Sequence, residues 1–288
     1  MATSTLSIRL FGATSAVGRQ LLPRLARAAA EVTASSRVAQ ASDAALHWLQ
    51  EALPGAAAVD PATTHILSLG PLDLFVDWLA QQAPAGQLRQ VIAFGSTSAT
   101  TKSDSPAATE RALARRLLDA EAALARESAR LGIAWTLLRP TLIYGGSADL
   151  VARIARFSAR WHVHPLPLGS FGRALRQPVH AGDLAAATFA SIDNPAAFGR
   201  SFDLGGAEAL SLAQLIARSA RAQGNWSLTL PVPLSGLLRV AAVLGWLPAR
   251  AALSPASLQR MAQDQVFDTG PARAALGYAP RPFQPGAA

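Results

Sequence analysis

A glycine-containing turn near the start of the chain has the residue types and spacing needed to bind phosphate. It reads RLFGATSAVGRQLL over residues 9–22, with Gly12 and Gly18 in the outer glycine positions and Ser15 in the middle one. In strand–turn–helix nucleotide sites the first glycine allows the turn, the second admits a pyrophosphate, and the third packs helix on strand. Backbone N–H groups at the helix start would still point toward an anion. The alternative is an ordinary turn between a strand and a helix. The predicted dinucleotide contacts are Gly12, Thr14, Ser15, Ala16, Val17 and Gly18.

The next strand-like segment, EVTASSR at 31–37, indicates which dinucleotide the turn would prefer. Sites that prefer NAD usually place an acid at this strand end to bind the ribose hydroxyl. This segment ends instead in Ser35, Ser36 and Arg37. A guanidinium there suits a 2′-phosphate through charge-assisted hydrogen bonds, and Arg19 could add a second one. Ser36 and Arg37 are therefore predicted to bind NADP in preference to NAD, and the alternative is a merely exposed arginine.

Strand-like and helix-like segments alternate along the first half of the chain. Continuous apolar strands that alternate with helices predict an α/β fold, a Rossmann-type doubly wound parallel sheet covered by helices on both faces. We expect strands over 7–13, 31–37, 57–60, 65–71, 90–98 and 134–140, and helices over 17–29, 43–53, 72–82 and 110–132.

The pattern loosens after residue 150. We expect one helix over 149–163 and a second that begins after Asp183 as its N-cap. A strand is expected over 200–206, and a third helix over 211–224 with Ser211 as its N-cap. A nucleotide-binding domain over 1–150, with 175–205 returning to it, and a smaller interleaved lobe over 151–288 fit this pattern best.

Several segments, taken in order, resemble the atypical and extended members of the short-chain dehydrogenase/reductase superfamily, the NAD-dependent epimerase/dehydratase group. They are FGATSAVG, QVIAFGSTS, TLLRPTLIYG, QPVHAGDLA, FDLGG and LGYAPRPF, and they span nearly the whole chain. The resemblance implies that Thr97, flanked by Ser96 and Ser98, matches the catalytic Ser/Thr, and that Pro140 lines the nicotinamide end. It also implies cofactor contacts at Asp60 near adenine, and at Leu69, Gly70 and Ser96.

The tyrosine–lysine pair of active family members is missing. In that pair the lysine stands four residues after the tyrosine and lowers the phenol pKa from about 10, so that the phenol can transfer a proton. Only Tyr144 and Tyr278 exist, and neither has a lysine at that spacing. If Glu121 is aligned with the acid that follows the pair, the two positions become Leu113 and Leu117.

Two functions remain open on this basis. The first is an NADP-dependent oxidoreductase or epimerase-like enzyme that acts on a carbonyl or sugar-type substrate, with Thr97 or Tyr144 as an unconventional proton donor. Tyr144 could equally be a packed loop residue, and the hydroxyl of Thr97 could simply cap the strand end. The second is a non-catalytic NADPH-binding sensor, assembly factor or accessory subunit. Family segments favour the enzyme, and the missing pair favours the binding protein.

Composition narrows the kinds of site and of binding partner that the chain could have. The chain has 288 residues, no cysteine, and a net charge of +8, which excludes disulfides and thiolate metal sites. We expect no metal site, because His162 and His164 have no carboxylate or cysteine near them. The charge suits a solvated surface, an anionic ligand, a nucleic acid or an anionic membrane. We expect a small-molecule substrate and no nucleic-acid partner, and the oligomeric state is left open.

The apolar stretch at 234–248 is too short to span a bilayer. We expect it to pack on the protein, with a membrane-surface or protein contact as the alternative. The first residues lack the layout of a signal peptide, so we expect a cytoplasmic protein.

Overall fold

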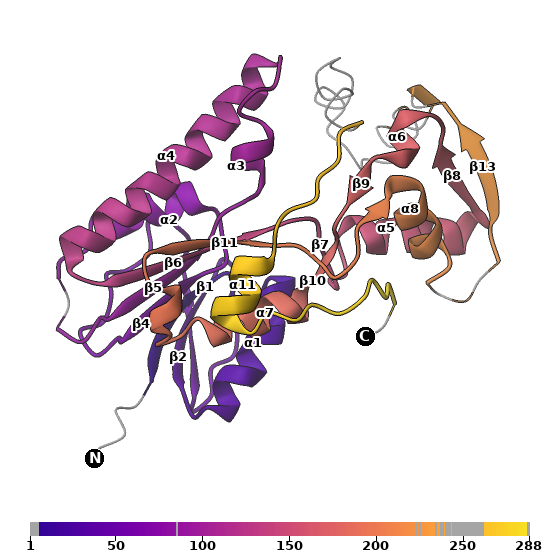
Figure 1. Cartoon of the computed structure of the whole chain (residues 1–288). Coiled ribbons are helices and arrows are strands. Elements are labelled where there is room, and N and C mark those ends of the chain that lie inside the picture. The colour runs from indigo at the N-terminus through magenta and orange to yellow at the C-terminus, as the bar shows by residue number, and fades with distance from the viewer. Residues whose placement is uncertain are drawn as a thin grey trace.

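The structure, a computed structural model, describes residues 6–84, 86–222, 224, 226–233, 235–236, 239, 243 and 262–286. A layered α/β body is joined to a smaller lobe (Figure 1). Most of the stretch 234–248, for which we expected a packing or membrane contact, lies outside the described residues.

Seven parallel strands form the central sheet, in the order β11-β6-β5-β4-β1-β2-β3. The sheet order reverses between β1 and β4, since the chain builds outward to β2 and β3 and then returns to the other side. Ligands of open α/β sheets bind beyond the strand ends at such a switch point. The strands are β1 (Ser7–Phe11), β2 (Glu31–Ser36), β3 (Leu46–Gln50), β4 (His65–Ser68), β5 (Gln90–Phe94), β6 (Ala134–Pro140) and β11 (Arg200–Leu204).

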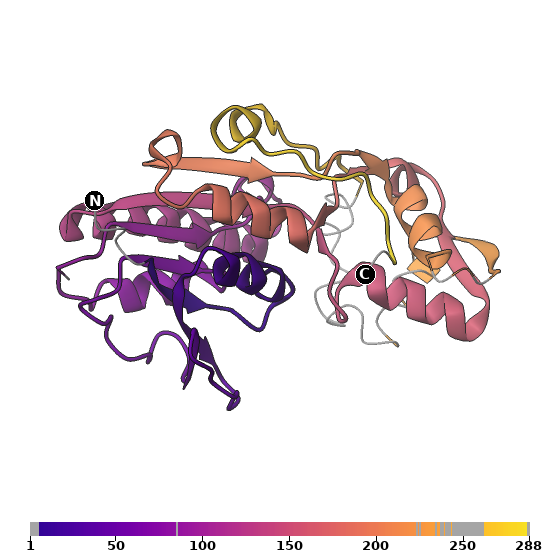
Figure 2. The same ribbon diagram turned by 90° about the horizontal axis from the view of Figure 1, so that it is seen from below.

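Helices cover both faces of the sheet, which confirms the doubly wound α/β prediction (Figures 1 and 2). Helices α1 (Ala16–Arg27) and α7 (Ala181–Ala190) pack against one apolar core, and α2 (Leu72–Leu79) and α4 (Ala108–Leu131) against the other. Helices α1, α2 and α4 bury apolar side chains along one face, whereas α7 is buried on nearly all sides.

The edge of the sheet differs from the sequence prediction. The segment 43–53 is not a helix, because Leu46–Gln50 is strand β3 and pairs in parallel with Val32–Ser36. Leu46 and Trp48 alternate onto the core under α1, and this two-residue period outweighs the helical spacing of the same apolar residues. The weak strand expected over 57–60 is also absent, and these residues form a loop.

The smaller lobe is built from short elements between β6 and the C-terminal tail. Its helices α5 (Leu150–Trp161) and α8 (Leu212–Ala220) pack together around a third apolar cluster. The remaining described elements, in the main body as well as in the lobe, are α3 (Ser98–Thr101), β7 (Ile143–Tyr144), β8 (Val163–Pro167), α6 (Ser170–Arg173), β9 (Leu175–Arg176), β10 (Val179–His180), a 3-10 turn (Pro195–Ala197), β12 (Leu210–Ser211), β13 (Leu228–Val232) and α11 (Gly270–Leu276). Strand β11 lies in the segment 175–205 and joins the main sheet beside β6. The domain boundaries themselves remain predictions.

Two helix starts test the capping predictions. Ser211 caps α8 as predicted, in a reciprocal pair of hydrogen bonds with Gln214. The predicted N-cap of α7 is wrong, because the Nδ1 atom of His180 accepts the N–H of Gly182 and begins the helix. Asp183 lies in the first turn and accepts two hydrogen bonds from Arg281 in the C-terminal tail.

No helix within the described residues is long and apolar enough to cross a membrane. In the same part of the chain, no three His, Cys, Asp or Glu side chains gather as metal ligands would. Of the two histidines considered above, His164 is buried on β8 and His162 ends α5 in a left-handed conformation.

Candidate functional site: a nucleotide crevice at the switch point

The turn after β1 has the conformation that its glycines predict. Gly12 has a φ of +79°, and a Cβ at this position would lie 3.1 Å from Leu69, so a side chain is disfavoured twice. A Cβ on Gly18 would lie 2.4 Å from the carbonyl oxygen of Ala13, which explains how closely α1 packs on the strand end. The outer two glycines therefore perform the roles expected of a nucleotide turn.

Ser15, in place of the middle glycine, begins α1. Its Oγ accepts a hydrogen bond from the N–H of Gly18 at 3.0 Å. The hydroxyl hydrogen is still available to donate to a ligand. Among the described residues, the N–H groups of Ala16 and Val17 have no protein acceptor. These donors and the positive end of the helix dipole are the groups that could bind an anion at the switch point.

Leu69 and Gly70 follow β4 on the other side of the same crevice. The N–H of Leu69 bonds to the carbonyl of Phe11 at 3.0 Å and holds the two strand ends together. The structure therefore brings Leu69 next to Gly12, as the predicted cofactor contacts require.

A pocket of about 430 Å³ continues from this turn toward β2 and β3. Arg19 of α1 and Arg37 after β2 both line it, and both side chains are exposed without an ion-pair partner among the described residues. The hydroxyl of Ser36 is bonded to the backbone of Val38 and shapes the loop between them. The other lining residues are Ala13, Thr14, Leu22, Gln40 and Trp48.

Trp48 and Gln40 are site residues that the sequence analysis missed. Trp48 stands on β3, within the segment expected to be a helix, and the helix prediction did not place it in the pocket that Arg37 lines. The two-residue alternation of Leu46 and Trp48 was the available signal.

The predicted catalytic hydroxyls lie where β5 and β6 end. The Oγ1 atom of Thr97 is 3.4 Å from the carbonyl oxygen of Pro140, to which it donates. Ser96 accepts the N–H of Ser98 at the start of α3. Ser96, Thr97 and Pro140 are thus grouped at one end of the sheet, and Thr97 is largely buried.

Next to Gly95, at the end of β5, the structure has an ion pair between Glu121 and Arg139 and not a proton-transfer group. Glu121 of α4 binds the guanidinium of Arg139 in a two-pronged contact, and Asp203 of β11 lies 3.8 Å from the same guanidinium. Burial raises the pKa of Asp203, partly offset by Arg139. Leu113 and Leu117 stand on α4 in the positions matched to the missing pair, and neither side chain can move a proton.

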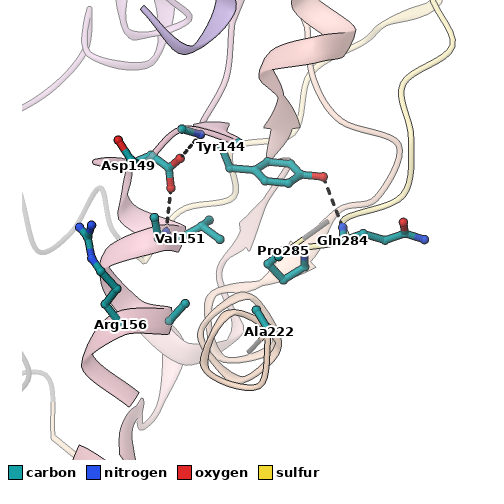
Figure 3. Close-up of a pocket in the computed structure, with 13 residues that line it drawn as sticks. Tyr144, Asp149, Val151, Arg156, Ala222, Gln284 and Pro285 are labelled. Carbon is teal, nitrogen blue, oxygen red and sulfur yellow. Dashed lines mark hydrogen bonds between the residues drawn. The ribbon is translucent and has the colours of Figure 1, made fainter. Parts of the chain in front are cut away.

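Tyr144 lies in a second pocket, of about 340 Å³, lined by the loop after β7, by α5 and by the C-terminal tail. Its ring is only 2% exposed and packs edge-on against His180 and Phe283. Its hydroxyl accepts the N–H of Gln284 at 3.3 Å and points at the C-terminal tail (Figure 3). Burial raises the pKa of Tyr144, which moves it away from proton transfer near neutral pH. Tyr144 therefore packs the tail, which was the alternative interpretation.

The same pocket opens beside the nucleotide turn. A Cβ on Gly146 would lie 3.0 Å from Cβ of Ala16, so its wall touches the start of α1. Asp149 caps α5 and binds the N–H of Gly146, and Arg156 stands on the same helix, facing Ala222 and Pro285 across the pocket (Figure 3). The pocket therefore lies where a second ligand could approach a bound dinucleotide.

Asp60 is not brought to this site. It lies in the loop before β4, where its carboxylate accepts the N–H of Ala62. Parallel strands place that loop at the opposite edge of the sheet from the turn at Gly12. The expected adenine contact at Asp60 is therefore not supported by its position.

Comparison with known proteins gives a likeness in fold. No family model matches the chain, and no curated protein sequence matches it. A UDP-glucose 4-epimerase from Thermotoga maritima, solved with UDP-glucose, is 13% identical with a TM-score of 0.66, over 96% of this chain and 94% of that one. A UDP-glucuronic acid 4-epimerase from Bacillus cereus, solved with UDP-glucuronic acid and NAD, is 14% identical with a TM-score of 0.68, over 97% and 95%.

A third structure, an epimerase from Methanothermobacter thermautotrophicus, is 13% identical with a TM-score of 0.71, over 98% of this chain and 90% of that one. The fold expected from the resemblance is therefore confirmed: the chain has the Rossmann-type fold of these epimerases over almost its whole length.

Proposed function

We propose that this chain binds a nicotinamide dinucleotide at the β1–β4 switch point and is an epimerase/dehydratase-like oxidoreductase for a carbonyl or sugar-type substrate. The observation that carries the proposal is that Ala13 and Thr14, in the turn directly before the start of α1, line the same pocket as Arg19 and Arg37. A pyrophosphate fits at the start of α1, and an adenosine fits the pocket. When bound, the nicotinamide would accept or return a hydride.

Each part of the crevice has its own task in this proposal. The N–H groups of Ala16 and Val17 and the hydroxyl of Ser15 hold the pyrophosphate. Thr97 and Pro140 lie at the nicotinamide end, where the Thr97 hydroxyl orients a substrate oxygen. The pocket between β7, α5 and the tail takes the substrate, and the substrates of the neighbouring structures are UDP-sugars.

The choice between NADP and NAD depends on two opposed observations. Two unpaired guanidiniums and no carboxylate line the adenosine pocket, which supports NADP. Several of the neighbouring structures hold NAD, which supports NAD. We propose NADP, because the charge of this chain's own pocket acts directly on the 2′ position.

Titration of the full chain with NADPH and with NADH, followed by fluorescence, tests this choice. The Arg37→Ala variant should bind NADPH at least tenfold more weakly and NADH almost unchanged, since a charge-assisted bond is worth about 1.5–3 kcal/mol. Arg115→Ala, on the exposed surface of α4, is the matched control. Equal binding of both dinucleotides, unaffected by Arg37→Ala, would reject the NADP proposal. No binding of either would reject the site itself.

The second candidate function is a non-catalytic dinucleotide-binding protein. It is favoured by the two leucines at the positions of the catalytic pair and by the buried hydroxyl of Tyr144. Incubation of the chain with NAD or NADP and UDP-glucose or UDP-glucuronic acid separates the two candidates. Formation of reduced nicotinamide or of an epimerised sugar that requires Thr97 supports the enzyme. Tight dinucleotide binding with neither product from these sugars supports the binding protein.

A further inference from the structure

The positive charge of this chain is concentrated in the smaller lobe. Residues 150–182 and 209–263 together hold ten of the 26 basic residues and none of the 18 acidic residues. The remainder therefore has 16 basic and 18 acidic residues and is slightly negative. Such an asymmetry points to an anionic partner for one part of a protein. The nucleotide pocket cannot account for it, because Arg19 and Arg37 lie outside both stretches.

The lobe also carries an unusual sheet. Strands β8 and β13 form a two-stranded parallel sheet, with Leu228 opposite Val163 and Leu230 opposite Pro165. His164 and Thr229 share the inner face, where they bond to each other and His164 is fully buried near α8. The outer face therefore consists of Val163, Pro165, Leu228 and Leu230, and we call it the β8–β13 outer face.

The β13 residues of this outer face are exposed to solvent, and Val163 and Pro165 of β8 are partly exposed. Leu228 is 58% exposed and Leu230 is 40% exposed. Parallel sheets are normally covered on both faces, and a contiguous exposed apolar surface usually marks an interaction site. Figures 1 and 2 both show β13 at the outer side of the lobe, remote from the seven-stranded sheet.

Two indoles stand at one end of this face. Trp161, at the end of α5, is 59% exposed, and the guanidinium of Arg160 lies 5.6 Å from its ring centre. Trp226, just before β13, is 73% exposed and stacks on His162. Exposed tryptophans beside arginines are typical of surfaces that lie at the boundary between lipid headgroups and acyl chains.

Further basic groups lie close to the same sheet. Arg221, at the end of α8, acts electrostatically on His164 of β8, and Arg173 lies on α6, which packs on β8. Both are exposed, and neither has an acidic partner among the described residues. We propose that the β8–β13 outer face docks on an anionic membrane surface, with Trp161, Trp226, Leu228 and Leu230 in the interface and Arg160, Arg173 and Arg221 at the headgroups.

The apolar residues distinguish this proposal from simple charge attraction. A DNA duplex would be held by the arginines through its phosphates and would leave the leucines in water. A membrane buries them, so its binding depends on both kinds of residue.

Co-sedimentation of the full chain with vesicles tests the proposal. We expect binding to vesicles of phosphatidylcholine with about one third phosphatidylserine, weaker binding in high salt, and little binding to phosphatidylcholine alone. Arg160→Gln with Arg221→Gln should weaken binding at least tenfold, since each basic residue contributes roughly fivefold. Leu228→Thr with Leu230→Thr should also weaken it about tenfold. The matched control is Arg115→Gln with Leu118→Thr on exposed α4, which should change nothing.

Fluorescence reports insertion directly. Vesicles with brominated acyl chains should quench part of the tryptophan emission, and Trp161→Phe with Trp226→Phe should abolish that quenching. Thermal unfolding and dinucleotide titration of each variant establish that it is folded. Binding that depends on the arginines but not on the leucines or indoles would overturn the proposal, as would no binding to acidic vesicles. Tighter binding to a DNA duplex than to acidic vesicles would assign the basic lobe to nucleic acid instead.

Discussion

The hydroxyl oxygen of Ser15 accepts the backbone N–H of Gly18 at 3.0 Å. Ser15 stands where the usual nucleotide turn has its middle glycine, and through this bond it caps helix α1. A residue that departs from the usual glycine pattern thus gains a structural role. The cap fixes the first turn of α1, whose remaining N–H groups face the proposed pyrophosphate.

Substitution of Ser15 separates the cap from ligand binding. Ser15→Ala should lower the free energy of unfolding by about 1 kcal/mol, whereas Ser15→Gly should lower it by only a few tenths. Glycine admits a pyrophosphate at least as closely as serine and leaves the N–H groups of Ala16 and Val17 in place, so Ser15→Gly should weaken NADPH binding only severalfold, by the one hydrogen bond of the lost hydroxyl. Urea unfolding and NADPH titration of both variants measure the two effects. A Ser15→Ala variant as stable as the unaltered chain would show that the Ser15–Gly18 bond contributes nothing.

The second prediction concerns Trp48 in the pocket with Arg37. Its indole lines the wall of the adenosine pocket and carries no charge. Trp48→Ala should therefore weaken NADPH and NADH by the same factor, about tenfold, because it removes apolar contact common to both. Arg37→Ala should weaken only NADPH. Parallel titrations of both dinucleotides measure this, and a selective effect of Trp48→Ala on NADPH would contradict the assignment.

Trp48 also marks the limit of what the sequence could predict. The turn at Gly12 and Gly18, the buried strands and the helices that cover them follow from local residue patterns, and the structure has them. The structure of segment 43–53 does not follow from its local pattern, because its apolar residues fit both a helical and a strand period. Pairing with Val32–Ser36 decides for the strand, and that pairing is a tertiary contact.

The site around Tyr144 shows a similar limit. A tyrosine after β6 is near the crevice by sequence, yet its orientation depends on the C-terminal tail, more than a hundred residues later. Likewise, His180 caps α7, and the carboxylate of Asp183, in the first turn of that helix, binds Arg281 of the tail. The orientation of Tyr144 and the partner of Asp183 both depend on contacts with the distant tail, which no local sequence pattern contains.

The two tyrosines give a third prediction. The hydroxyl of Tyr278 donates to the carbonyl of Gly205 at 2.9 Å in a buried position, whereas the contacts of the Tyr144 hydroxyl are 3.3 and 3.5 Å long. Tyr278→Phe leaves a buried carbonyl without a donor and should cost about 1–3 kcal/mol of stability. Tyr144→Phe should cost less, about 0.5 kcal/mol, and should leave any oxidoreductase activity unchanged. Loss of activity in Tyr144→Phe with normal stability would restore Tyr144 as a proton donor.

The last prediction concerns pH and the buried histidines. Burial lowers the pKa of His65, His164 and His180, so all three resist protonation in the folded chain. In the unfolded chain they take up protons at the ordinary value of about 6.5. Their neutral forms therefore support full stability above that pH, and stability should fall as the pH drops below it toward the folded-state values. The carboxylates Glu127 and Glu208, whose pKa values are lowered by arginine hydrogen bonds, act only at lower pH.

His180 isolates this effect, because its Nδ1 atom must stay unprotonated to accept the N–H of Gly182. His180→Asn keeps an acceptor at the N-cap of α7 and removes the titrating group. The fall in Tm between about pH 7.5 and pH 5.5 should be smaller in His180→Asn than in the unaltered chain. A variant at an exposed histidine, His47→Asn, should show the same fall as the unaltered chain. If His180→Asn also shows an unchanged fall, protonation of this cap does not govern stability in that range.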